Sequence, residues 1–350
     1  MALAAVLTIS AIAQPPPLQP SKKKKNEDKE PVTQTLPVLR EPPGAVAAET
    51  SKLIFHVSPL SGKGLLTPQT RDALNALMRL NRGAQIVKIR AFVAGTGDIR
   101  RVQAIVSEIF TEKKQPLPAV TTVQVGGLPM EGAQVVLESS SLDKKPVRSN
   151  GLAFFSGQKA ADAPPAIAQL EAAAKAAGTT SARMLQVTCF LSSLDRIQSA
   201  RDAVAHTFPS AVANFVQALR ASAEPFAVCE GIGDSSQQRD AVSLTANAAL
   251  VSAPKLVLTG AQMAFRDQDA DLRLAFQRLQ RALEPLGVSY QDVVFSSIYP
   301  LTKIIADKTS AIAAEFLPSQ GSLPGTVQML EGLPSLDASM AIEVIAAPRN

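Results

Sequence analysis

Aromatic, imidazole and thiol side chains are scarce in this sequence, and the scarcity limits both its cores and its chemistry. Among 350 residues there is no Trp, and there are two each of Tyr, His and Cys. Cores must therefore be filled by aliphatic residues, which favours small, regular α/β units. With only two imidazoles, a histidine-based metal site or catalytic triad is hard to assemble, so we expect no metal and no cofactor. Cys189 and Cys229 lie in apolar runs without CxxC spacing, which indicates buried, reduced thiols.

Long apolar runs are also missing, so we expect no membrane span. The short apolar stretch Ala2–Ile12 is similar to the hydrophobic part of a signal peptide, but no Lys or Arg precedes it, and an Arg-rich presequence is absent. The net charge of +5 permits contact with RNA or an anionic surface, although no dense basic stripe requires one.

Residues 1–51 have the composition of a tail without a core, because prolines and mixed charges replace apolar residues. Four consecutive lysines are the candidate partner-binding residues: Lys22, Lys23, Lys24 and Lys25. Two interpretations stay open. The tail is a solvated linker, or it becomes ordered by lying along a partner protein or RNA.

Three segments repeat one order of elements, with starts about 100 residues apart. Apolar strands are expected at 52–58, 152–158 and 255–262, each ending in a turn of small residues, and again at 86–93, 184–191 and 293–299. Helices are expected around 73–80, 167–174 and 274–286 and at 99–110, 197–208 and 304–316. Two final strands close each segment, at 121–125 and 134–138, at 214–219 and 226–230, and at 326–330 and 340–345. The predicted order is β-α-β-α-β-β, an α/β (α+β) class.

Several motifs in these segments resemble the RidA (YjgF/YER057c) family. They are Ser156-Gly157-Gln158 after an opening strand, Ile109-Phe110-Thr111-Glu112 at the end of a second helix, and Leu117-Pro118-Ala119 before a third strand. The resemblance implies three tandem chorismate-mutase-like domains, at 52–145, 150–236 and 241–350. Family members usually form homotrimers with sheets around a central barrel and sites in the clefts between subunits. Three fused copies would therefore form an intramolecular pseudo-trimer and need no homotrimer.

The same resemblance indicates which chemistry is retained and which is lost. In active members an Arg after Pro-Ala binds the carboxylate of an imine or enamine substrate, for which a guanidinium is well suited. Val120, Ala213 and Gly325 occupy that position here. The turns expected to line the clefts contain Ser156, Gly157, Gln158, Thr259 and Gly260.

A glutamate that helps to position the hydrolytic water in the family falls at the matching place in every segment, as Glu138, Glu230 and Glu343. One interpretation is a retained general acid/base. The other, which we favour because the substrate anchor is missing, is a structural carboxylate held by backbone or basic partners between units.

The favoured hypothesis is a catalytically inactive RidA-like pseudoenzyme that serves as a scaffolding subunit of a larger protein assembly. A mitochondrial ribosome or another organellar ribonucleoprotein is the expected setting, with RNA as a further partner and a cytoplasmic location as the alternative. Two alternative functions stay open: an imine/enamine deaminase with a rearranged site, and an RNA-directed translation regulator.

Overall fold

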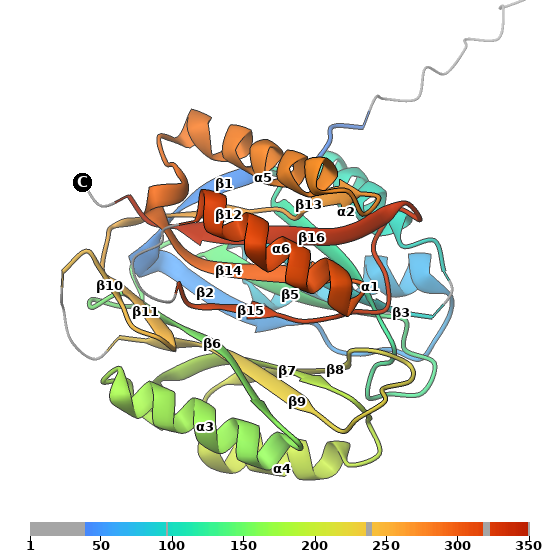
Figure 1. The fold of residues 1–350 in the computed structure, drawn as a ribbon, viewed down its shortest axis with the longest axis horizontal. Helices are drawn as coiled ribbons and strands as arrows, with labels where there is room; N and C mark the ends of the chain where they lie inside the picture. The colour runs from blue at the N-terminus through green and yellow to red at the C-terminus, as the bar shows by residue number, and fades with distance from the viewer. Residues whose placement is uncertain (1–38, 96, 236–239, 318–322, 349–350) are drawn as a thin grey trace, which may run out of the picture. The chain divides into compact units, whose positions relative to one another are not determined.

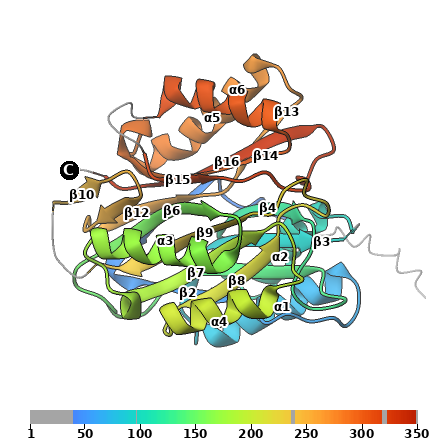
Figure 2. The same cartoon turned by 60° about the horizontal axis from the view of Figure 1, so that its bottom comes forward.

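Each of the three repeated segments folds into a sheet covered by a pair of helices in the computed structural model of the chain (Figures 1 and 2). The structure describes residues 39–95, 97–235, 240–317 and 323–348, which belong to one body. The Ala2–Ile12 stretch and the four lysines lie outside the described residues. The segments 52–145, 150–236 and 241–350 are called unit 1, unit 2 and unit 3 below.

Unit 1 has four strands in the order β2-β5-β3-β4, of which only β3 and β4 run parallel. Its elements are β2 (Leu53–Val57), α1 (Leu66–Leu80), β3 (Gln85–Ala94), α2 (Arg100–Glu112), β4 (Ala119–Val125) and β5 (Val135–Leu142).

Units 2 and 3 repeat this arrangement, with the orders β6-β9-β7-β8 and β12-β16-β14-β15. Unit 2 contains β6 (Leu152–Ala160), α3 (Ala163–Ala176), β7 (Met184–Leu191), α4 (Ile197–Thr207), β8 (Val212–Gln217) and β9 (Ala227–Asp234). Unit 3 contains β12 (Lys255–Thr259), β13 (Gln262–Phe265), α5 (Asp269–Leu283), β14 (Val293–Pro300), α6 (Lys303–Phe316), β15 (Gly325–Val327) and β16 (Ala338–Ala346). Short 3₁₀ turns lie at Thr50–Lys52, Ser181–Arg183, Glu284–Leu286 and Tyr290–Asp292. The predicted β-α-β-α-β-β order is confirmed in each unit, and β13 adds a short strand in unit 3.

Both faces of each sheet are buried, which explains why the strands read as nearly continuous apolar runs. On the outer face of unit 1, for example, Leu77 of α1 and Ile105 of α2 pack with Ile89 of β3. On the inner faces the three units share a core that includes Phe92, Phe190 and Tyr299. The sheets therefore meet in the interior, and the helix pairs lie outside them (Figures 1 and 2). No helix within the described ranges is long and apolar enough to cross a membrane.

Two strands cross from one unit to the sheet of another. β1 (Ala45–Glu49), which precedes unit 1, pairs with β12 of unit 3. β11 (Ala248–Val251), which forms a hairpin with β10 (Val242–Leu244) at the start of unit 3, pairs with β6 of unit 2. The prediction that 1–51 lacks structure is therefore wrong for residues 45–49. The sequence shows no alternation of polar and apolar residues here, because four of the five residues are Ala or Val and the fifth is Glu49.

The small residues after two opening strands are not simple turns, as the sequence had led us to expect. In unit 2 the strand continues through Ser156 and Gly157 as a β-bulge, in which these two residues lie opposite Glu230. In unit 3 the chain leaves β12 at Thr259 and resumes pairing with β16 at Gln262. Bulges of this kind bend the strand and change the direction of nearby side chains.

The two cysteines form a disulfide, so the expectation of reduced thiols is wrong. Cys189 of β7 and Cys229 of β9 lie directly opposite each other in an antiparallel pair, with their Cα atoms 4.2 Å apart. Close pairs of this type bring the two Cβ atoms near enough for the attached sulfur atoms to bond. The separation of 40 residues along the chain concealed this proximity.

Candidate functional site

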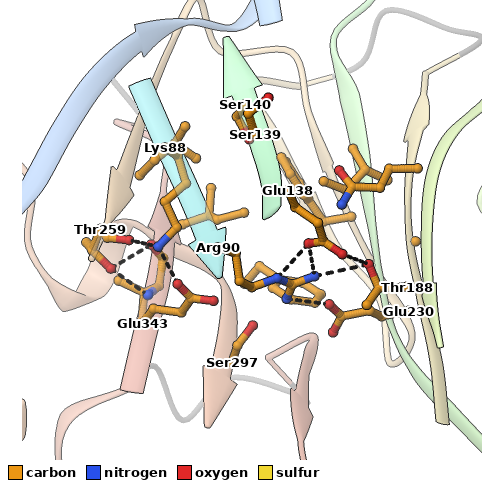
Figure 3. A pocket seen from close by; sticks show the side chains of 18 residues that line it. Lys88, Arg90, Glu138, Ser139, Ser140, Thr188, Glu230, Thr259, Ser297 and Glu343 are labelled. Carbon is orange, nitrogen blue, oxygen red and sulfur yellow. Dashed lines mark hydrogen bonds and ion pairs between the residues drawn. The ribbon is translucent and has the colours of Figure 1, made fainter. Parts of the chain in front are cut away.

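The three glutamates matched to the family lie around one central cavity. Glu138 pairs with Arg90 across β5 and β3, Glu230 with Thr188 across β9 and β7, and Glu343 with Ser297 across β16 and β14. The three pairs are thus equivalent positions in the three units. All six residues line a cavity of about 90 Å³ between the sheets (Figure 3).

Arg90, a residue that the sequence did not single out, engages all three of its side-chain nitrogens within this cluster. Its Nε and Nη2 both lie 2.7 Å from Oε2 of Glu138. Nη1 donates to Oε1 of Glu230 at 2.6 Å and to the Tyr299 hydroxyl at 3.2 Å, and Nη2 donates to Thr188 Oγ1 at 3.1 Å. Arg90 therefore ties unit 1 to units 2 and 3.

Both carboxylate oxygens of Glu138 accept hydrogen bonds from neighbouring residues. Besides Arg90, its Oε1 accepts hydrogen bonds from Thr188 Oγ1 and Asn214 Nδ2 of unit 2, each at 2.7 Å. A buried carboxylate with this many donors is held in one orientation.

Lys88 makes the second ionic connection, between units 1 and 3. Its ammonium group donates to Glu343 Oε2, to Thr121 Oγ1 at 2.6 Å and to the backbone carbonyl of Thr259. Thr121 also donates to Glu343 Oε2, while Tyr299 donates to Oε1 at 2.9 Å. Figure 3 shows Lys88 and Arg90 reaching from the same strand toward different carboxylates.

Burial and neighbouring charges shift the pKa values of this cluster in different directions. Burial raises the pKa of Glu343, but Lys88 and Arg90 outweigh it, so the pKa lies below its ordinary value. Burial lowers the pKa of Lys88 even though Glu343 opposes the shift. Burial would lower the pKa of Arg90, but Glu138 and other acidic neighbours raise it well above its ordinary value. Burial, reinforced by the charge of Glu343, raises the pKa of Tyr299, so its hydroxyl stays protonated at neutral pH.

The positions aligned with the family arginine lie outside this cluster. Val120 is buried in the helix-side core of unit 1, and Ala213 packs partly buried against the corresponding core of unit 2. Gly325 begins β15, where an added Cβ would lie 2.4 Å from the backbone oxygen of Ser296. None of the three carries a group that can bind a carboxylate.

The expected cleft residues lie against those positions in the neighbouring unit. The Gly325 N–H donates to Ser156 Oγ at 3.1 Å, and the Gly157 N–H donates to Thr326 Oγ1 at 3.1 Å. The Gln158 amide donates to the backbone of Ser156 instead. An added Cβ on Gly260 would lie 2.8 Å from the backbone oxygen of Val120, so unit 3 approaches unit 1 closely there. Direct contacts between units thus occupy two of the three predicted clefts, and in the third β2 packs along β8.

Sequence reasoning found the glutamates and missed their basic partners. Lys88 and Arg90 alternate with apolar residues in an otherwise buried strand, and charged residues are rarely buried unless they are paired. That alternation was the available signal. Among the described residues, no three His, Cys, Asp or Glu side chains are placed to hold a metal ion.

Comparison with known proteins gives structural likenesses only. No protein-family model matches the sequence, and no curated protein matches it either. Among solved structures, a YjgF/YER057c/UK114 family member from Mycobacterium tuberculosis is 21% identical, with a TM-score of 0.25, over 27% of this chain and 79% of that one. RidA from an Antarctic Psychrobacter is 18% identical, with a TM-score of 0.25, over 27% and 80%. A YjgF family protein from Neisseria meningitidis is 12% identical, with a TM-score of 0.25, over 29% and 85%.

Each of these likenesses spans about one unit of this chain. The fold assignment therefore depends on the order and pairing of this chain's own elements, which repeat in all three sheets.

Proposed function

We propose that this chain, which has a RidA-like fold, is a RidA-like pseudoenzyme that serves as a structural subunit of a larger protein assembly. The observation that supports it most is the state of the three clefts. None offers an arginine at the matched position, and hydrogen bonds or close backbone contacts between units take the place of a substrate in two of them. A carboxylate-bearing imine would find no cationic anchor at the matched positions.

A deaminase with a rearranged site would need another group to bind the substrate carboxylate. Arg90 is the strongest candidate because it lies beside all three glutamates. All three of its side-chain nitrogens already contact protein acceptors, however, and it forms ion pairs with Glu138 and Glu230. The ammonium group of Lys88 is likewise fully hydrogen-bonded. The ion pairs therefore argue for a structural role of the retained glutamates.

The proposed partners are inferred from the N-terminal segment. An organellar ribonucleoprotein, such as the mitochondrial ribosome, is the proposed setting because of the proline-rich segment with four lysines at positions 22–25. An RNA-directed translation regulator has only the net charge of +5 in its favour. The Cys189–Cys229 disulfide counts against the alternative of a cytoplasmic location.

Fractionation of the source cells by particle size tests the assembly role. The tagged full-length chain is expected in a fraction far larger than 36.8 kDa, with a stoichiometric set of crosslinked proteins identified by mass spectrometry. A variant with Lys22, Lys23, Lys24 and Lys25 all changed to Gln should be incorporated less efficiently at low salt, and its difference from the wild type should shrink at high salt, where the lysine contacts are themselves screened. Recovery of the wild-type chain only at its own mass would contradict the proposal.

A further inference from the structure

One carboxylate oxygen that borders the central cavity has no hydrogen-bond partner within the part of the chain that the structure describes. Among the described residues, Oε2 of Glu230 is buried and accepts no hydrogen bond, although Oε1 accepts from Arg90. The side chain of Glu230 is only 8% exposed, and it lines the central cavity. Buried polar atoms are nearly always hydrogen-bonded, so an orphaned carboxylate oxygen points to a missing donor.

The asymmetry of the three units explains the orphan. Unit 2 presents Thr188 and Asn214 to Glu138, and both donate to it. The equivalent positions of unit 3 are Ser297 and Thr326, by their pairing in β14 and β15. Within the described part of the chain neither is hydrogen-bonded to Glu230. Thr326 instead accepts from Gly157, and Ser297 is the shortest of the three side chains that lie opposite the glutamates. Space therefore remains beside Glu230 where the other units supply a donor.

The charge of the cluster selects the kind of donor. Three carboxylates face two basic groups, Lys88 and Arg90, so the ionised cluster carries one excess negative charge. The glutamate side chains are 4 to 9% exposed, so water screens this charge weakly. Since the nitrogens of both basic groups already contact protein acceptors, the cavity suits a cation with N–H donors and disfavours a carboxylate.

The cavity wall selects the rest of the ligand. Beyond the charged cluster it is lined by Phe154, Leu258 and Phe295, and the two phenyl rings have their centroids 6.2 Å apart. The more exposed part of the cavity is lined by the half-buried residues that lie two positions after each glutamate: Ser140, Ile232 and Ile345. An apolar body can therefore pack against this pair of rings while its charged end reaches Glu230.

We propose that the central cavity binds a small primary ammonium cation with a short apolar body. The ammonium group donates to Oε2 of Glu230, with Ser297 and Gln186 as further oxygen acceptors on the same wall. The alkyl part packs against Phe154 and Phe295. Figure 3 shows Glu230 and Ser297 on the same side of Arg90, facing the space that the ammonium group would occupy. This site is independent of the proposed assembly role.

Calorimetric titration of the full-length protein with n-butylammonium chloride tests the proposal. We expect saturable 1:1 binding, and no binding of butyrate, which has the same length and the opposite charge. Glu230→Gln should weaken binding by about tenfold or more, because it removes a charge-assisted hydrogen bond. Glu108→Gln removes one charge from the surface helix α2 and should leave binding unchanged.

A measurement on the wild-type protein decides the matter if Glu230→Gln fails to fold. Nuclear Overhauser contacts are expected between the methyl protons of bound n-butylammonium and the ring protons of Phe154 and Phe295. Absence of saturable binding, equal binding of butyrate, an unchanged affinity in a folded Glu230→Gln variant, or contacts to other aromatic rings would each overturn the proposal.

Discussion

Three glutamates in equivalent positions have three different environments. Glu138 accepts from Arg90, Thr188 and Asn214, and Glu343 accepts from Lys88, Thr121 and Tyr299. Within the described ranges, Glu230 accepts only from Arg90. The pseudo-threefold backbone thus carries a cluster without threefold symmetry, because each unit supplies different side chains. A homotrimer could not create this asymmetry, since its three subunits have one sequence.

At this scale the pKa of Glu343 predicts a pH dependence of stability. The pKa is lowered in the folded protein, so the carboxylate stabilises the fold above its ordinary pKa of 4.5 and this contribution is lost as the pH falls through the folded value. Glu343→Gln should reduce the free energy of unfolding by about 3 kcal/mol at neutral pH, because Lys88 loses its counter-charge.

Urea denaturation of both proteins from neutral pH down to about pH 3 measures the effect. The difference between them should shrink below pH 4.5, since the wild-type carboxyl becomes neutral as well. Glu315→Gln, which removes an exposed ion pair with Arg273, serves as the control and should change stability little. A wild-type-to-mutant difference that stays constant over this pH range would contradict the assignment.

At the scale of elements, the exchanged strands connect units that are distant along the chain. β1 covers the edge of β12, and the Thr50 side chain donates to the carbonyl of Ala253 at 2.6 Å. An uncovered edge would expose unpaired backbone groups. β1 is therefore part of the sheet of unit 3, although it precedes unit 1.

Two truncations separate the tail from this strand. Removal of residues 1–38 should leave the free energy of unfolding within about 0.5 kcal/mol of wild type, because the body begins at Leu39. Removal of residues 1–50 also removes β1 and should cost roughly 3 kcal/mol through lost backbone hydrogen bonds and exposure of β12. Urea denaturation followed by circular dichroism distinguishes them. Equal stability of the two truncated proteins would show that β1 contributes nothing to the fold.

The sequence predicts elements whose signals are local and misses features that depend on tertiary pairing. Apolar periodicity located both helices and the main strands of every unit, and motif spacing located the three glutamates. The strand that pairs with β1 could not be predicted, because the sequence of a five-residue strand does not indicate which sheet edge it joins. Cys189 and Cys229 meet only because β7 and β9 pair in one register. Arg90 could be recognised as buried, but its partners in units 2 and 3 depend on how the sheets face one another.

At the scale of the whole molecule, the three units of the chain pack against one another through their sheets. The inner faces share one core, and backbone hydrogen bonds join the units. The Gly126 N–H donates to the Gln217 carbonyl at 2.8 Å, and the Gln124 N–H donates to the Gly332 carbonyl at 2.8 Å. In the described part of the chain, the helix pairs cover one face of each sheet and the other units pack against the opposite face. The purified protein should therefore be a monomer.

Multi-angle light scattering during size exclusion tests this expectation. A mass near 36.8 kDa, unchanged on dilution, is predicted. A stable species of three times that mass would mean that the units of different chains assemble with one another, and the intramolecular arrangement would be wrong.

The loss of family chemistry is the central claim, and hydrolysis of 2-iminobutanoate to 2-oxobutanoate and ammonia tests it most directly. A family member that retains the arginine should be assayed in parallel as the positive control. Val120, Ala213 and Gly325 provide no carboxylate anchor, and the side-chain nitrogens of Arg90 already contact protein acceptors. The wild-type protein is therefore predicted to leave the imine decaying at its uncatalysed rate. Turnover comparable to that of the positive control would contradict the account.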